Sequence, residues 1–179
     1  QVSRLYASGS SVLTGNVATE AAWKEQAPAF RILHVATHGT LNRSNPMYSS
    51  LALRAGAGDD GLLEAREILD VRLQADLAVL SACDTGRGEL HEGEGVLGLG
   101  WAFLSAGAAS AAVSQWQVDS QATSELMLAF HRGVEKGLTP TALRGKAESL
   151  RQASLSMLQG AKYKHPFYWA GFSLLGDGL

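Results

Sequence analysis

The chain has 179 residues, 46% of them hydrophobic, with one cysteine and a formal net charge of −2. This length suffices for one self-sufficient core, and we predict a single domain over residues 1–179. The small net charge gives no overall attraction to nucleic acid or to an anionic membrane. A lone cysteine forms no internal disulfide, and no apolar stretch reaches the length of a membrane span. The sequence thus predicts a cytoplasmic domain that binds neither nucleic acid nor membrane directly.

The first half of the chain alternates short apolar runs with helical patterns. We expect an edge strand at 11–14 and a helix at 20–26 that Thr19 caps and Pro28 ends. The later elements are predicted as a buried strand at 31–39, a strand at 50–54 that begins a hairpin off the main sheet, a helix at 64–69, a buried strand at 77–83, a glycine-rich loop at 86–95 and a buried helix at 96–106.

The second half continues this pattern with a strand at 109–118 and a final strand at 165–175. Between them, Asp119 or Ser120 can cap a helix. The stripe that faces the core of this helix is predicted as Leu126, Phe130 and Val134, and a second helix from Thr139 and Pro140 is predicted to bury Leu143, Ala147, Leu150, Ser154 and Leu158. Strands that alternate with helices predict an α/β fold with a mainly parallel sheet flanked by helices.

Two of the buried strands end in residues that can carry out chemistry. One ends at His38, which Gly39 follows, and the other ends at Cys83, 45 residues later. Reactive groups collect at the carboxyl ends of parallel strands, so we expect the two side chains to meet there. A cysteine nucleophile needs a group that moves protons near neutral pH, and histidine suits this role. The alternative is that Cys83 is a buried small hydrophobe and His38 a structural residue.

Backbone amides at the same edge can stabilise an oxyanion. Gly39 has no side chain to obstruct a substrate carbonyl, and the amides of Gly39 and Cys83 are the predicted donors. A metal site is not expected, since His34 and His38 are four residues apart on a strand and span about 13 Å. His34 is predicted to be a core histidine, and no metal or organic cofactor is required.

Four short motifs occur in order along the chain: Ala36–Gly39, Leu80–Gly86, Trp116–Asp119 and His165–Phe172. In this order they resemble the successive signatures of CHAT-domain cysteine peptidases, which are bacterial relatives of caspases and separases. The resemblance implies a three-layer caspase-like sandwich, with Cys83 as nucleophile and His38 as general acid/base of an endopeptidase. It also implies a longer parent protein, often with TPR repeats, that acts in bacterial regulation or defence.

The substrate preference depends on the region after the strand at 109–118. In the family this region borders the pocket for the residue before the cut, and Ser114, Gln115 and Trp116 are expected to pair with a peptide substrate. A partly buried Asp119 carboxylate would favour cleavage after Arg or Lys. If Asp119 is instead a helix N-cap, the pocket can be apolar and select Leu-like residues.

The resemblance leaves two classes of function open. The first is an active cysteine endopeptidase that cleaves proteins or peptides and is regulated by a TPR or other segment of the parent protein. The second is a catalytically silent or latent module that keeps the fold for protein interaction. Because Gln1 is not a methionine, we expect the chain to be an N-terminally truncated fragment of a longer protein.

Overall fold

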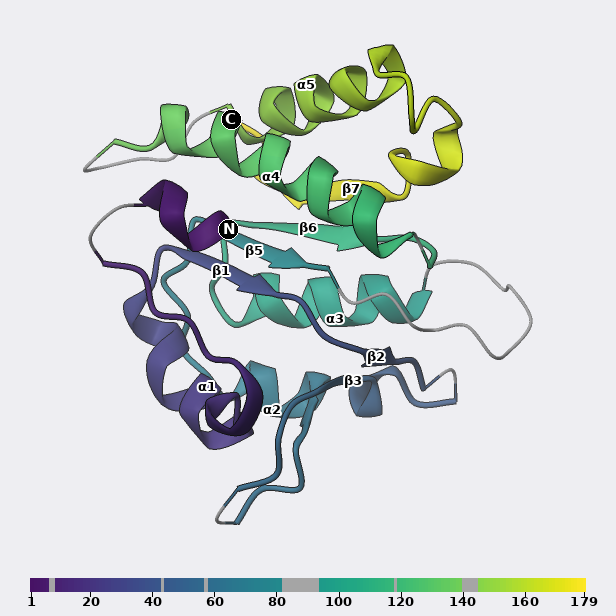
Figure 1. The fold of residues 1–179 in the computed structure, drawn as a ribbon. Coiled ribbons are helices and arrows are strands. Elements are labelled where there is room, and N and C mark those ends of the chain that lie inside the picture. Colours follow the sequence, from purple (N-terminus) through teal and green to yellow (C-terminus); the bar gives the residue numbers. More distant parts are fainter. Residues whose placement is uncertain (7–8, 43, 57, 82–93, 118, 140–144) are drawn as a thin grey trace.

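The computed structural model describes residues 1–6, 9–42, 44–56, 58–81, 94–117, 119–139 and 145–179. Its central sheet has the strand order β1-β5-β6-β7 (Figure 1). The strands are β1 (Ile32–Val35), β5 (Leu77–Leu80), β6 (Ser110–Ser114) and β7 (Phe172–Gly176). The first three are parallel to one another, and β7 runs antiparallel to β6. The sheet is therefore mostly parallel, as predicted.

A second, smaller sheet leaves the main one after β1. Its three antiparallel strands are β2 (Gly39–Thr40), β3 (Ser50–Ala52) and β4 (Leu62–Glu64), in the order β2-β3-β4. This arrangement confirms the predicted excursion off the main sheet. The backbone that follows β1 is consequently held by β3.

Helices cover both faces of the central sheet (Figure 1). The side chains of β5 alternate between the faces: Ala78 and Leu80 join one buried cluster, and Leu77 and Val79 join the other. The first cluster includes side chains from α1 (Glu20–Gln26), α2 (Ala65–Leu69) and α3 (Glu94–Ser105). The second cluster includes side chains from α4 (Ser120–Gly137) and α5 (Lys146–Gln159). The protein is thus a mixed α/β structure with a mostly parallel sheet flanked by helices.

Local capping and periodicity explain several of these helices. The hydroxyl oxygen of Thr19 accepts a hydrogen bond from the Ala22 amide at 3.2 Å. The helix α1 begins at Glu20, directly after Thr19, as predicted. In α2, Glu64 and Glu67 form a capping box. The predicted stripe on α4, Leu126, Phe130 and Val134, is completely buried.

Three predictions about the ends of the chain are wrong. Residues 11–14 form no strand; Val12 is 58% exposed, and the Ser11 hydroxyl donates to the side chain of Gln26 instead. The final strand begins only at Phe172, because residues 166–168 form a 3-10 turn. On α5 the buried residues are Lys146, Ser149, Leu150, Ala153 and Met157, whereas Ala147 and Leu158 are exposed.

The rotation of α5 has a packing cause. Gly133 of α4 lies against Ser149 of α5, so close that a Cβ at Gly133 would stand 2.7 Å from the Ser149 hydroxyl. This close approach turns the face with Ser149 and Ala153 toward α4. The predicted start of this helix, residues 140–144, and the predicted loop at 86–95, up to residue 93, lie outside the described residues.

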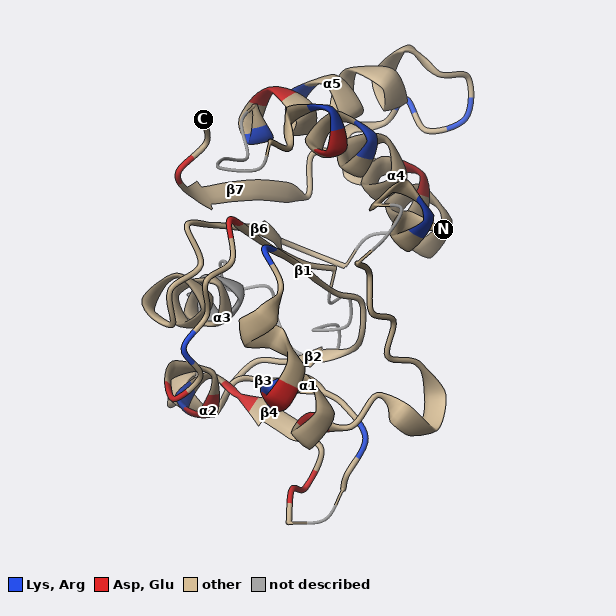
Figure 2. Ribbon diagram, turned by 90° about the vertical axis from the view of Figure 1, so that its left-hand side faces the viewer, with Lys and Arg blue, Asp and Glu red and all other residues tan. Residues whose placement is uncertain are grey.

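The charged side chains are distributed over the helices. Figure 2 shows segments of both signs on α4 and α5, whereas the ribbon of β7 carries neither. This mixture agrees with the small net charge of the chain. Among the described residues, none of the helices combines the length and the apolar character needed to cross a bilayer.

Candidate functional site at the carboxyl edge of the sheet

The carboxyl ends of β1 and β5 lie side by side. The two strands pair in parallel from Ile32 with Leu77 to Val35 with Leu80, and the Ser81 amide then donates to the Val35 carbonyl at 2.9 Å. Paired residues differ by 45 in number, which is also the interval between His38 and Cys83. Cys83 itself lies outside the described residues, so its side chain has no described position.

His38 is exposed at the end of this strand pair. Its carbonyl accepts the Ala52 amide at 2.8 Å, and the hydroxyl of Thr37 donates to the Ala52 carbonyl. These two bonds connect the segment after β1 to β3. The backbone at His38 is thus held by the small sheet while the residue remains accessible.

Gly39 is buried and pairs with Leu51 of β3. In an antiparallel ladder the bonding direction alternates from residue to residue. Because His38 bonds to Ala52 on β3, the amide of Gly39 is directed away from β3. The ladder thus does not use this amide, and the oxyanion role of Gly39 stays a prediction.

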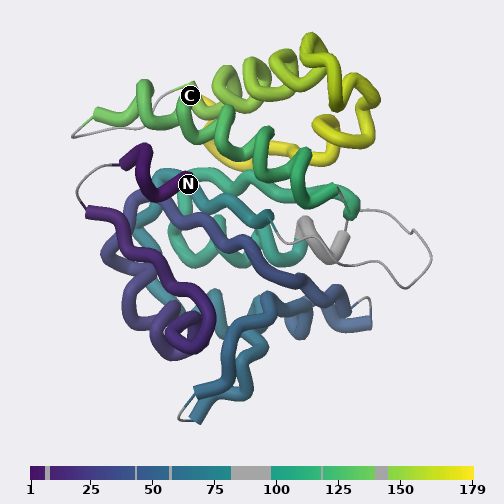
Figure 3. Tube along the Cα trace, in the orientation of Figure 1, coloured from purple at the N-terminus to yellow at the C-terminus, as the bar shows by residue number. Residues whose placement is uncertain are grey.

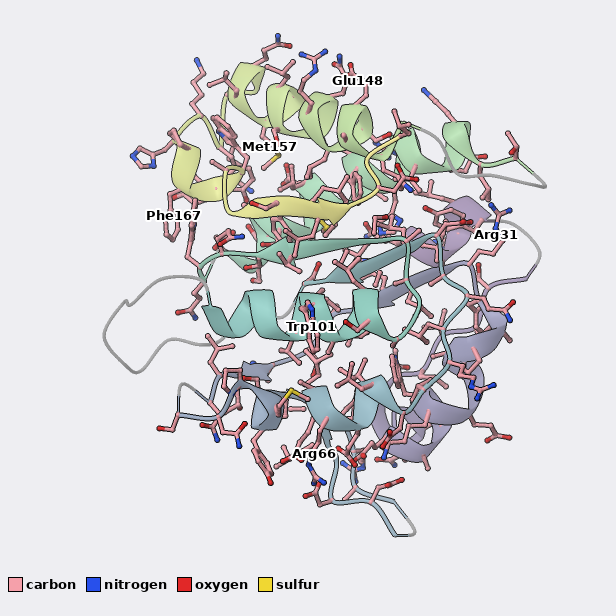
Figure 4. All side chains as sticks on the ribbon, turned by 180° about the vertical axis from the view of Figure 1, so that it is seen from behind. Arg31, Arg66, Trp101, Glu148, Met157 and Phe167 are labelled. Atoms are coloured by element: carbon pink, nitrogen blue, oxygen red, sulfur yellow. The ribbon has the colours of Figure 1, made fainter. Side chains whose placement is uncertain are left out.

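The predicted peptide-binding segment follows β6. Ser114 is buried, and its hydroxyl donates to the Trp116 carbonyl at 2.7 Å. The amide of Gln115 donates to Gly171 at 2.6 Å, and the indole Nε1 of Trp116 donates to the Phe167 carbonyl at 3.1 Å. Phe167, labelled in Figure 4, lies on the turn before β7 and is 45% exposed. The partly exposed Trp116 and Phe167 therefore form an apolar surface at this end of β6.

Asp119 is exposed and caps α4. One carboxylate oxygen, Oδ1, accepts the amides of Gln121 at 3.0 Å and Ala122 at 2.9 Å. The N-cap that the sequence allowed is thus present. Both bonds are accepted by Oδ1. The selection of a basic substrate residue by this carboxylate stays a prediction.

A pair of histidines below the edge was not predicted. Nδ1 of His34 lies 3.0 Å from Nε2 of His131, and the rings stack with centroids 5.0 Å apart. Nε2 of His34 lies 3.1 Å from the Ser81 hydroxyl, and the Tyr6 hydroxyl lies 2.7 Å from Nδ1 of His131. The four residues connect the N-terminal 3-10 turn (Val2–Tyr6), α4, β1 and the end of β5.

Both histidines favour the neutral form. Burial lowers the pKa of His34 to about 4, and burial together with the charge of His34 lowers the pKa of His131 to about 3. The expectation that His34 is a core histidine fits this environment. A signal for its partner was present, because His131 follows Met127 by four residues, on the buried face of α4.

One group of side chains has the composition of a metal site. Oxygens of Glu20, Asp59 and Glu67 lie within 4.8 Å of one another. However, the Lys24 ammonium contacts all three, at 2.6 Å from Glu20, 3.2 Å from Asp59 and 3.1 Å from Glu67. The lysine supplies the positive charge that a metal ion would otherwise supply, so these residues form an ion-pair cluster.

The fold and the edge together define a class of protein. It is an α/β protein in which a histidine and a glycine follow one parallel strand. In the sequence, a cysteine follows the strand that pairs with it. The CHAT domain family matches residues 1–177, and the chain belongs to this family, whose class is that of caspase-like cysteine peptidases.

Two mammalian proteins are similar to part of the chain. Tetratricopeptide repeat protein 28 of Mus musculus is 36% identical over 118 residues, and that of Homo sapiens is 35% identical over 118 residues. Each match covers 66% of this chain but only 4% of the relative. The chain therefore corresponds to a small part of proteins that are named for tetratricopeptide repeats.

Proposed function

We propose that this domain is a cysteine endopeptidase with Cys83 as nucleophile and His38 as general acid/base. The observation that carries the proposal is the register of β1 and β5, whose 45-residue offset equals the separation of the two residues. Both residues follow the last paired residue of their strand by three positions. Membership of the CHAT family supports the same assignment.

The reaction follows from the chemistry of these groups. The Cys83 thiolate attacks the scissile carbonyl carbon, and the amides of Gly39 and Cys83 bind the oxyanion. The C–N bond then breaks, the amine leaves with a proton from the His38 imidazolium, and an acyl-thioester remains. Water attacks the thioester, His38 accepts its proton, and the thiolate departs. No metal or organic cofactor takes part in these steps.

The wider setting is part of the same proposal. We infer a caspase-like three-layer sandwich in a single domain of a longer, cytoplasmic protein, in a bacterial regulatory or defence pathway. Similarity to tetratricopeptide repeat proteins supports a parent chain with such repeats as the regulatory segment. The substrate would be a protein or peptide, with Ser114, Gln115 and Trp116 near its binding path. The alternative, a catalytically silent interaction module of the same family, predicts no covalent reaction at Cys83.

A peptidyl acyloxymethyl ketone distinguishes these two functions. We expect the reagent to modify Cys83 of the wild type, as shown by an intact-mass increase and peptide mapping, and to leave His38→Ala unmodified at the same reagent concentration. Because the chain has one cysteine, no other thiol competes for the reagent. No modification of the wild type, or equal modification of both proteins, would favour the silent module.

Asp119 gives a prediction about specificity. If its carboxylate selects a basic residue, Asp119→Asn should lower the ratio of kcat/KM for Arg over Leu fluorogenic peptides by about tenfold, which corresponds to 1.4 kcal/mol. Asparagine caps helices about as well as aspartate, so this variant removes the charge and retains the cap. Asp119→Ala, which removes both, is the comparison. An unchanged ratio in Asp119→Asn would assign the carboxylate to the α4 cap alone and favour an apolar pocket.

A further inference from the structure

Tyr6, His131, His34 and Ser81 form an unbroken line of hydrogen bonds that ends at the carboxyl edge of the sheet. The contacts along the line measure 2.7, 3.0 and 3.1 Å. They join residues that are up to 125 positions apart in sequence. Figures 1 and 3 show the N-terminal turn, which carries Tyr6, beside α4. The line thus crosses from a helix through β1 to the residue that follows β5.

The proton positions along the line are coupled. A neutral imidazole has one N–H donor and one acceptor nitrogen, so protons can be arranged in only two ways along the two rings. Burial and the charge of Glu135 raise the pKa of Tyr6, which therefore keeps its proton. Tyr6 lies 2.7 Å from Nδ1 of His131 and donates to the His131 carbonyl at 3.5 Å, so its oxygen can either donate to Nδ1 or accept from Nδ1–H.

The direction of the Tyr6 bond fixes the remaining donors. With Nδ1 of His131 as acceptor, its Nε2–H donates to Nδ1 of His34. The Nε2–H of His34 then donates to the Ser81 hydroxyl oxygen. In the opposite arrangement the Ser81 hydroxyl donates to Nε2 of His34, so Ser81, which stands two residues before Cys83 in the sequence, is bonded to His34 in both.

We infer that His34 is a positioning residue of the proposed reaction and acts through Ser81, with His131 and Tyr6 fixing its ring and tautomer. The inference rests on the proposed function, because it concerns the reaction assigned to Cys83 and His38. The geometry that supports it is that β1 carries His34 and leads to His38, and β5 leads to both Ser81 and Cys83. The bond to His34 orders the Ser81 hydroxyl at the end of the second strand.

Two variants of equal size test this role. Thr and Val at position 81 differ only in the hydroxyl group, so both introduce the same extra bulk. We expect Ser81→Thr to keep kcat within about threefold of the wild type, and Ser81→Val to lower kcat about tenfold with KM nearly unchanged. His34→Gln, which cannot continue the line through a second ring nitrogen, should lower kcat by a similar factor. Thermal unfolding of each variant shows whether it is folded at the assay temperature.

The outcomes separate the two proposals. If the wild type cleaves peptides and Thr and Val at position 81 behave alike, the positioning role is wrong and the peptidase assignment stands. If the wild type cleaves no peptide, the peptidase assignment fails and the positioning role fails with it. Nitrogen-15 NMR of the histidine rings tests the line independently: we expect both rings to carry the same tautomer, either Nε2–H or Nδ1–H, and different tautomers on the two rings would overturn the line.

Discussion

Cys83→Ala is expected to lower kcat/KM for peptide hydrolysis by about ten-thousand-fold or more, because no other thiol in the chain can form the acyl-enzyme. His38→Ala should lower it by about a hundredfold to ten-thousand-fold, the usual contribution of a general acid/base. The two residues act as a unit, so the double variant should be hardly slower than Cys83→Ala. Rates measured on one fluorogenic peptide, for all three variants, check this expectation.

A matched control uses a histidine outside the proposed catalytic pair. His165 is exposed and its ring accepts the Phe167 amide at 3.2 Å, at the start of the turn before β7. His165→Ala should keep the wild-type rate within about threefold, since it removes a single exposed hydrogen bond. If His165→Ala and His38→Ala lose activity equally, the loss reports on folding and the assignment of His38 would be contradicted.

The second large effect is a loss of stability in mild acid. The ordinary histidine pKa of 6.5 falls to about 4 for His34 and about 3 for His131 in the folded protein. Between pH 6.5 and 4 the unfolded chain therefore binds more protons than the folded one. Stability is complete above pH 6.5 and decreases as the pH falls through this window, by about 3 kcal/mol for a single histidine shifted this far.

Urea unfolding at pH 7.0 and 4.5 measures this decrease. Among the described residues, Tyr6 and Phe130 contact the His131 ring, Ser81 contacts the His34 ring, the two rings contact each other, and Glu135 adds negative charge near Tyr6. We expect His131→Gln to be less stable than the wild type at pH 7.0 but to lose less stability on acidification. His165→Gln should lose as much as the wild type. Equal losses in wild type and His131→Gln would show that the buried histidines do not cause the acid sensitivity.

Residues with strong local signals were predictable. Thr19 and Asp119 have the side chains that cap helices, and both do so. The spacing of Leu126 and Phe130 identified the buried face of α4. The apolar runs at β1 and β5 predicted two buried parallel strands, and the two strands do pair in parallel. In each case the information lies within a few neighbouring residues.

Features that depend on distant contacts were not predictable. The buried face of α5 is set by the close approach of Ser149 to Gly133, which no local pattern encodes. The contact between His34 and His131 joins residues 97 positions apart. Each histidine alone looks like a structural residue, and only the fold brings their rings together. The predicted edge strand at 11–14 failed for a similar reason, since the Ser11 hydroxyl donates to the side chain of Gln26 on α1.

The central claim is that the Cys83 thiol and the His38 imidazole interact at one edge of the sheet. The rate of iodoacetamide alkylation as a function of pH tests it most directly, because Cys83 is the only thiol. A thiolate–imidazolium pair predicts rapid alkylation of the wild type well below the ordinary thiol pKa of about 8.5, and a shift of the profile toward that value in His38→Gln. Superimposable profiles for the two proteins would contradict the claim.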